Sequence, residues 1–444
     1  MKTYNHLFDS ICSFENLMAA ARAAERGRRL NDHVGRFRAR VEAEVLRLRK
    51  ELTNGIYQPG SYREFWIREP KERMISAAPY RDRVVHHAVC RVVMPLFERK
   101  MIADLYSNRP GKGTHAAIRR CQHWCRKYRY VLKCDVTKYF PSMDHAVLKQ
   151  AIRRTIRCQD TLRLMDAIID NSNLQEAVCT VFPGDDIAEA AERRVGLPIG
   201  NLTSQWFGGI YLTAFDHWVQ ETLRAGAYVR YVDDFLLFSD DKVQLREWRQ
   251  AICERLHMHR VRLNERKSRV YRVQDGVTFL GQRVWPGRRR LARANVARVR
   301  RRLRAQADLY RAGQLAKDSL IQRWASWKGH ALQADGTALV AVVRDELRRR
   351  IGNAGNESVS GAAGRVVEQQ REQRAGREPE QQQPGQREQQ HWFPLREGDS
   401  SGREAVGRSR EVYEHPWRPG RKPTRVDRFR RSWRNEYDTP VRGQ

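Results

Sequence analysis

Apolar side chains recur at helical spacing in the first part of the chain. Residues three and four positions apart share one face of a helix, and the first such set is Leu17, Ala20, Ala21 and Ala24. A second run at this spacing follows at residues 41–46. We therefore predict helical structure over residues 14–55, with Asn54-Gly55 as a turn.

Strand and helix patterns then alternate. Residues 62–67 alternate apolar and polar side chains as in a strand, whereas residues 81–101 return to helical spacing. Short strand-like runs occupy residues 130–135 and 228–238, with helical stretches between them. These patterns predict a mixed α+β core over residues 55–285.

A very basic helix is predicted at residues 288–309. Its apolar stripe consists of Leu291, Val296, Val299 and Leu303, and seven arginines lie between Arg290 and Arg304. Such a helix is either a solvated surface element or one that lies along a phosphate backbone, where neutralised phosphates release counterions. We favour the phosphate-binding interpretation.

The charge balance favours a polyanionic partner. The chain of 444 residues has 84 Lys and Arg against 52 Asp and Glu, a formal net charge of +32. Nucleic acid is the usual partner of such a protein, and a generally basic protein is the alternative. No run approaches the roughly 18 apolar residues of a membrane-spanning helix. Neither a signal peptide nor paired CxxC spacing occurs, so we expect no membrane partner and a reducing, cytoplasmic location.

Three aspartates are the candidate catalytic groups. Asp233-Asp234 lies between apolar, β-rich flanks, which predicts a hairpin with an acidic turn, and Asp135 ends a second strand. Adjacent carboxylates repel each other and cost stability if buried unpaired. Binding of Mg²⁺ removes this conflict, because hard divalent cations take oxygen ligands. Three aspartates suit two Mg²⁺ ions, with Mn²⁺ as an alternative, at a separation of about 3.5–4 Å.

The segment Tyr231-Val232-Asp233-Asp234 resembles the YxDD box of reverse transcriptases. Asp135 with Phe140 is similar to the family's upstream aspartate box, and further matches lie in the family's order at residues 81–87, 108–113, 263–268 and 279–281. The resemblance implies a right-hand polymerase fold. Its expected parts are an N-terminal helical segment (1–54), fingers (55–125), a palm (126–285), a basic helical thumb (286–350) and a low-complexity, disordered tail (351–444).

The resemblance also implies roles for further residues. Phe140 would be a steric gate that clashes with a ribose 2′-hydroxyl, although a core aromatic explains the local sequence equally well. Phosphate oxygens suit Arg forks and Lys ammonium groups. The other nucleotide-binding candidates are Lys71, Arg73, Arg83, Ile199, Gly200, Gln205 and Lys267, and the primer-grip candidates are Phe279, Leu280 and Gly281.

Residues 196–205 depart from the family's usual LPQGxxxSP box. Ile199 stands where Gln is usual, and Gln205 where Pro is usual. This form resembles the reverse transcriptases of diversity-generating retroelements, which copy a template repeat with errors at adenines and deliver the cDNA into a variable gene. Alternatives are a group II intron-type or retron reverse transcriptase, and a non-catalytic RNA-binding relative.

The same resemblance implies the partners. They are the template RNA, the RNA–DNA hybrid, dNTPs and a small basic helical accessory protein, in a bacterial or phage-encoded enzyme of the cytoplasm.

The segment at residues 368–390 supports the retroelement hypothesis independently. All fourteen of its Glu and Gln residues are followed by Gln, Arg, Pro or His, whose codons begin with C (for Arg, four of six do). If Glu is GAA and Gln is CAA, a shift of one base turns each of these codons into AAC. Rows of AAC resemble a template repeat, so we hypothesise that residues after about 350 are an out-of-frame reading of one. A plain low-complexity tail is the alternative.

Overall fold

The computed structural model describes residues 2–26, 32–68, 72–173 and 178–352. Lys71 and residues 353–444 of the predicted tail (351–444) therefore lie outside the described residues, whereas residues 351–352 belong to the last helix and not to a tail. Within these ranges no helix is long and apolar enough to cross a membrane.

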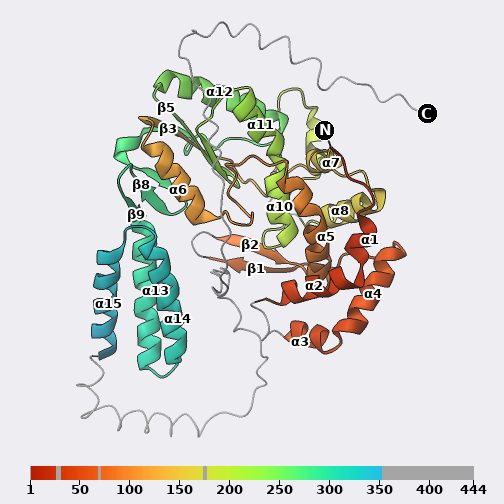
Figure 1. The fold of residues 1–444 in the computed structure, drawn as a ribbon, viewed down its shortest axis with the longest axis horizontal. Coiled ribbons are helices and arrows are strands. Elements are labelled where there is room, and N and C mark those ends of the chain that lie inside the picture. The colour runs from red at the N-terminus through yellow and green to blue at the C-terminus, as the bar shows by residue number, and fades with distance from the viewer. Residues whose placement is uncertain (1, 27–31, 69–71, 174–177, 353–444) are drawn as a thin grey trace, which may run out of the picture. The chain divides into compact units, whose positions relative to one another are not determined.

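The N-terminal helices pack against a long central helix (Figure 1). The elements are α1 (Phe8–Cys12), α2 (Phe14–Glu25), α3 (Asp32–Ala39), α4 (Val41–Thr53) and the central helix α5 (Tyr80–Glu98). Within the described residues, the predicted helical region 14–55 contains three helices, α2 to α4. The face of α2 predicted to be apolar is buried in a core that it shares with α5.

Two strands precede the central helix. The expected strand is β1 (Arg63–Ile67), and it pairs antiparallel with β2 (Arg73–Ala77). Ser76 of β2 donates its backbone N–H to Ile199 O (3.1 Å). The small sheet is thereby attached to the loop that carries two of the nucleotide-binding candidates.

A four-stranded antiparallel sheet forms the centre, in the order β4-β5-β3-β6. Its strands are β3 (Tyr130–Asp135), β4 (Tyr228–Tyr231), β5 (Asp234–Ser239) and β6 (Arg269–Arg272). Successive side chains of a strand point to opposite faces, so Leu132 and Cys134 enter one apolar core while Val131 enters another.

Different elements cover the two faces of this sheet. The Leu132 face packs on helices that include α10 (Leu202–Tyr211), α11 (Thr213–Glu221) and α12 (Lys242–Met258). Three further helices lie between β3 and α10 in the chain: α7 (His145–Arg153), α8 (Gln159–Asp170) and α9 (Ile187–Glu192). The Val131 face packs on α6 (Thr114–Cys125) and a small sheet. That sheet consists of β7 (Val277–Phe279), β8 (Gln282–Val284) and β9 (Arg289–Leu291), after a 3₁₀ turn at Val273–Asp275.

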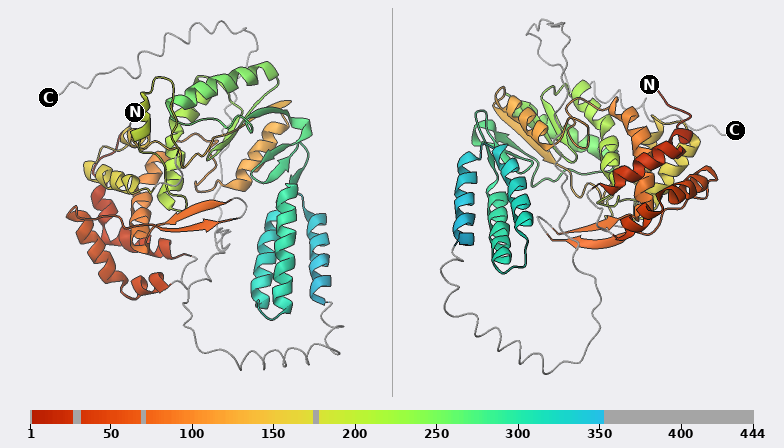
Figure 2. Two further views of the ribbon diagram at one scale, coloured as in Figure 1. Left: turned by 180° about the vertical axis from the view of Figure 1, so that it is seen from behind. Right: turned by 60° about the horizontal axis from the view of Figure 1, so that its bottom comes forward.

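Three helices with a core of their own follow (Figure 2). They are α13 (Arg293–Arg311), α14 (Lys317–Leu332) and α15 (Thr337–Gly352). The prediction of a helix from residue 288 was wrong at its start, because residues 289–291 pair with β8 as strand β9. Arg300 and Arg304 form ion pairs with Glu346 of α15, so part of the basic surface of α13 is neutralised within the bundle.

Candidate active site

The central sheet brings the three aspartates together at one end. In the β3–β5 pair, Asp135 lies directly opposite Asp234. Asp233 occupies the turn between β4 and β5, and its carbonyl accepts a hydrogen bond from the Val136 N–H (3.2 Å). The predicted acidic hairpin and its neighbouring strand are therefore present.

Two lysines face the carboxylates. Lys267 Nζ donates to Asp135 Oδ2 (2.5 Å), and Lys133 Nζ lies 3.7 Å from Asp234 Oδ2. Burial raises the pKa of Asp234 to about 7; Lys133 opposes this rise, whereas the charges of Asp233 and Asp135 add to it. The pKa of Asp233 is also raised by burial, and the positive charges of Arg73 and Lys267 counteract that rise.

The oxygen ligands of the three aspartates suit a divalent cation chemically, but their side chains are not arranged around a common metal position. Within the described ranges, no group of three His, Cys, Asp or Glu side chains is arranged to hold a metal ion. The buried Asp234 Oδ1, however, has no hydrogen-bond partner. A cation would supply that partner and relieve the mutual repulsion that adds to the effect of burial on the two pKa values. The metal-ligand role of the aspartates stays a prediction.

The basic candidates lie in different surroundings. Arg73, on β2, is close enough for its charge to lower the pKa of Asp233. Arg83 instead donates its Nε to Ala78 O (2.8 Å) at the start of α5. Of the two, Arg73 is the one whose charge acts on a carboxylate of the candidate site.

Phe140 follows the strand that carries Asp135. Its ring meets that of Tyr139 edge-on at 5.6 Å, and a Cβ placed on Gly208 would lie 3.3 Å from it. It is partly buried against the large core. This environment suits both the steric gate and the core aromatic.

Residues 196–205, which form the loop before α10 and its first turn, contact both β2 and residues 108–113. Gly200 has φ +118°, and a Cβ at this position would approach Ile75 Cγ2 to 2.8 Å, so only glycine fits. The carbonyl of Gln205 accepts a hydrogen bond from Asn108 Nδ2 (3.1 Å). Asn201, which was not predicted, is buried and donates its Nδ2 to Ser76 O (2.9 Å).

The primer-grip candidates form a tight turn between β7 and β8. Leu280 and Gly281 have φ of 46° and 81°, as expected in a two-residue hairpin loop of type I′. Phe279 is fully buried in the core beneath. The Gly281 carbonyl accepts from the Ala292 N–H (2.9 Å) and from Asn295 Nδ2 (3.1 Å). The turn is thereby fixed to the beginning of α13.

Sequence reasoning missed Lys133 and Arg230. Lys133 could have been predicted, because residues two apart in a strand share a face and Asp135 is two positions further on. Arg230 was signalled by its single charge within the otherwise apolar and aromatic residues 228–232. It is fully buried, and the helix residue with which it pairs is not evident from sequence.

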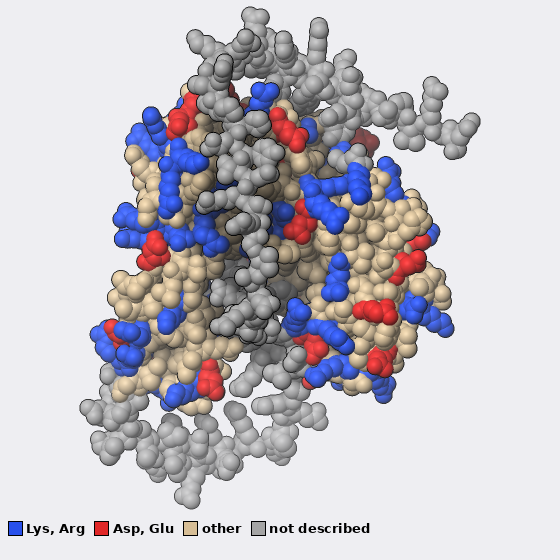
Figure 3. All heavy atoms as spheres, in the orientation of Figure 1, with Lys and Arg blue, Asp and Glu red and all other residues tan. Residues whose placement is uncertain are grey.

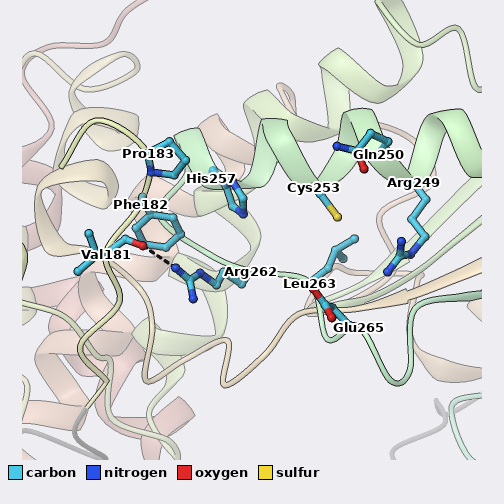
Figure 4. A pocket seen from close by; sticks show the side chains of 10 residues that line it. All are labelled: Val181, Phe182, Pro183, Arg249, Gln250, Cys253, His257, Arg262, Leu263 and Glu265. Atoms are coloured by element: carbon cyan, nitrogen blue, oxygen red, sulfur yellow. Dashed lines mark hydrogen bonds between the residues drawn. The ribbon is translucent and has the colours of Figure 1, made fainter.

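A cavity of about 620 Å³ lies beside α12 (Figure 4). Phe182 and Arg262 face one another there at 5.2 Å, and Leu263 forms a β-bridge with Val136, next to Asp135. None of the three aspartates lines this cavity. It is therefore distinct from the candidate active site.

Cations and aromatic rings share the surface near α6. Figure 3 shows Lys and Arg gathered over the part of the molecule that contains α6 and β8. The Arg120 guanidinium lies 4.5 Å from the ring of Trp124. Arg283 and Arg288 lie 5.2 and 4.8 Å from that of Trp285. Rings combined with positive charge are typical of nucleic-acid-binding surfaces.

Comparison with known families is decisive for the central part of the chain. Residues 67–284 match the family described as reverse transcriptase (RNA-dependent DNA polymerase). This segment is a reverse transcriptase domain. It contains all three aspartates and both strands of the acidic hairpin.

Individual proteins are similar to parts of this chain. The chain is 26 % identical to protein YkfC of Escherichia coli over 288 residues, covering 56 % of this chain and 73 % of YkfC. It is 24 % identical to nuclear intron maturase 1 of Arabidopsis thaliana over 127 residues, 28 % of this chain and only 18 % of the maturase. Among solved structures, an apo telomerase from Candida tropicalis matches with a TM-score of 0.38 and 14 % identity, over 52 % of this chain and 48 % of the other.

Proposed function

We propose that the protein is an RNA-directed DNA polymerase with Asp135, Asp233 and Asp234 as its catalytic acids. The observation that carries this proposal is the pairing of Asp135 with Asp234 across β3 and β5, inside a reverse transcriptase domain. When bound, two Mg²⁺ ions, or Mn²⁺, would activate the primer 3′-hydroxyl and neutralise the pyrophosphate leaving group.

The protein's own side chains position the reactants. Arg73, whose charge opposes the rise in the pKa of Asp233, binds the triphosphate together with Lys71 and Arg83. Phe140 is the steric gate beneath the sugar. Lys267 balances the charge of Asp135. The turn of Phe279, Leu280 and Gly281 holds the primer strand. In this proposal the fingers, palm and thumb are residues 55–125, 126–285 and 286–350, and the RNA–DNA hybrid is recognised by shape and backbone.

Primer extension tests the activity. Wild-type protein should extend a DNA primer on an RNA template, and Asp233→Ala should reduce the rate by at least about 10³-fold, because metal neutralisation of charge supplies most of the rate enhancement. Both proteins should bind the hybrid with similar affinity. Equal extension by wild type and variant would exclude the proposed site, and binding without extension by either would favour the non-catalytic RNA-binding alternative.

We further propose that the polymerase serves a diversity-generating retroelement. The support is the Ile199 and Gln205 form of the loop and the codon pattern proposed for residues 368–390. A template-repeat RNA, a variable target gene and a small basic accessory protein would be its partners. A group II intron-type or retron enzyme remains the competing proposal, and the similarity to an intron maturase favours it. The gene distinguishes the two: a near-copy of the tail's DNA differing at adenines supports the retroelement, and Gln codons that are mostly CAG contradict it.

The error spectrum tests the role of Ile199. Restoring the family's glutamine with Ile199→Gln adds a polar contact worth about 1 kcal/mol beside the nascent base pair. Misincorporation opposite template adenine should therefore fall by about fivefold relative to the other bases. Ile199→Leu, which keeps the apolar bulk, is the control. Unchanged adenine errors in the glutamine variant, measured by sequencing cDNA, would remove this role.

A further inference from the structure

The turn of the acidic hairpin has an unfavourable backbone conformation. Val232 has φ +59°, in the left-handed region that β-branched residues seldom adopt. Such a conformation persists only where the surroundings hold it in place. Whatever holds Val232 also sets the direction in which the chain continues into Asp233.

Side chains bind both peptide groups of Val232. Its N–H donates to Ser107 Oγ (3.2 Å), and its carbonyl accepts from Arg230 Nη1 (2.8 Å). The second bond fixes the peptide that joins Val232 to Asp233. Arg230 therefore acts on the backbone immediately before the acidic pair.

Arg230 is itself held by a buried carboxylate. Its Nε and Nη2 donate to Asp216 Oδ1 and Oδ2 at 2.6 and 2.5 Å, and both side chains have no exposed surface. Tyr228 Oη also donates to Asp216 Oδ1 (2.8 Å), and Arg230 Nη2 donates to Gly209 O (3.2 Å). The guanidinium thus connects the hairpin to α10 and α11 beneath it.

Stability alone does not account for this arrangement. Removing two charges from water is costly, and apolar side chains of similar volume are often equally stable in place of a buried pair. An apolar side chain, however, cannot donate to the Val232 carbonyl. We propose that Arg230 and Asp216 are a positioning pair, which orients the Val232–Asp233 peptide so that Asp233 and Asp234 face the divalent cations. This inference rests on the proposed function.

An apolar replacement of the whole cluster separates positioning from stability. Arg230→Met alone would leave the Asp216 carboxylate buried and unpaired, so the decisive variant combines Arg230→Met, Asp216→Leu and Tyr228→Phe. Thermal unfolding, Mn²⁺ binding by electron paramagnetic resonance and primer extension are measured. We expect a folded protein whose Mn²⁺ affinity is about tenfold weaker. Its kcat should fall by about 10²-fold, the effect of misplacing catalytic groups by about 1 Å, with little change in KM for dNTP.

Arg153→Met is the control for the loss of an Arg–Asp pair outside the candidate site. Arg153 forms a two-bond pair with Asp166, between α7 and α8, and its loss should leave Mn²⁺ affinity unchanged. Arg230→Lys keeps a positive charge beside Asp216 but loses the planar fork of donors. This variant should therefore fold, yet bind Mn²⁺ more weakly than wild type. Wild-type Mn²⁺ affinity and kcat in the folded triple variant, or in folded Arg230→Lys, would overturn the positioning role. The proposed function is tested separately on the wild-type protein. It fails if wild type does not extend primers and if Asp233→Ala leaves its Mn²⁺ binding unchanged, and this inference then fails with it.

Discussion

At the scale of single residues, the raised pKa of Asp234 links metal binding to pH. Burial raises this pKa to about 7, so the metal-free carboxyl is largely protonated below that pH. Mg²⁺ must displace the proton. The apparent Mg²⁺ affinity, measured from the Mg²⁺ dependence of primer extension, should therefore strengthen by about tenfold between about pH 6 and about pH 8. A Mg²⁺ requirement that is constant over this range would contradict the assignment.

The same group makes a prediction about stability. The pKa of Asp234 is higher in the folded protein than the ordinary value near 4, so the fold favours the neutral carboxyl. Its stabilising contribution is complete below about pH 4 and is lost as the pH rises through about 7. In metal-free protein, Asp234→Asn should remove the part of the pH-dependent fall in stability that this carboxyl causes. Thermal unfolding across the range measures it, and an identical pH dependence in wild type and variant would contradict the pKa shift.

How far single residues could be predicted depends on how local their partners are. Asp233, Asp234 and Asp135 lie at the ends of strands. The apolar residues of each segment are enough to predict where these strands end. Arg230 and Asp216 lie 14 positions apart on a strand and a helix. Their pairing depends on how α11 packs beneath the sheet, and no pattern within either segment specifies that packing.

At the scale of elements, the turn between β7 and β8 depends on its glycine. Gly281 has φ +81°, and a Cβ would lie 2.6 Å from Asn295 Nδ2. Gly281→Ala should therefore displace the Asn295 side chain that ties the turn to α13, destabilise the protein by about 1 kcal/mol, and raise KM for primer–template more than KM for dNTP. Gly287→Ala, on the next turn, meets nothing within 4 Å and serves as control. Equal kinetics in the two variants would show that the turn does not hold the primer.

Element types were predictable where one periodicity dominates. The strand at residues 130–135 and the hairpin at 228–238 have short apolar runs, rich in β-branched and aromatic residues, that favour strands, and both are present. Residues 289–291 form a strand because β8 offers a free edge to pair with. Three residues are too few to show a periodicity, so the basic sequence around them predicted a helix from residue 288. The helix begins at Arg293.

At the scale of the whole molecule, the charge lies almost entirely before the tail. Residues 353–444 contain 18 Lys and Arg and 14 Asp and Glu, so 28 of the 32 net positive charges belong to residues 1–352. The described region also contains the reverse transcriptase domain and the three-helix bundle. If the tail is a template repeat read out of frame, it contributes nothing to catalysis or to binding of the hybrid.

A protein ending at Gly352 tests this directly. It should extend primers at a rate within about twofold of the full chain. The logarithm of its affinity for the RNA–DNA hybrid should fall with the logarithm of salt concentration at the same slope, because that slope counts neutralised phosphates, at about 0.7–0.9 per contact. Glu346→Gln in the full chain provides the contrast: by releasing Arg300 and Arg304, it should steepen the slope if α13 lies along the phosphate backbone. A truncated protein with a shallower slope or with lost synthesis would show that the tail binds the nucleic acid, and the out-of-frame hypothesis would then be wrong.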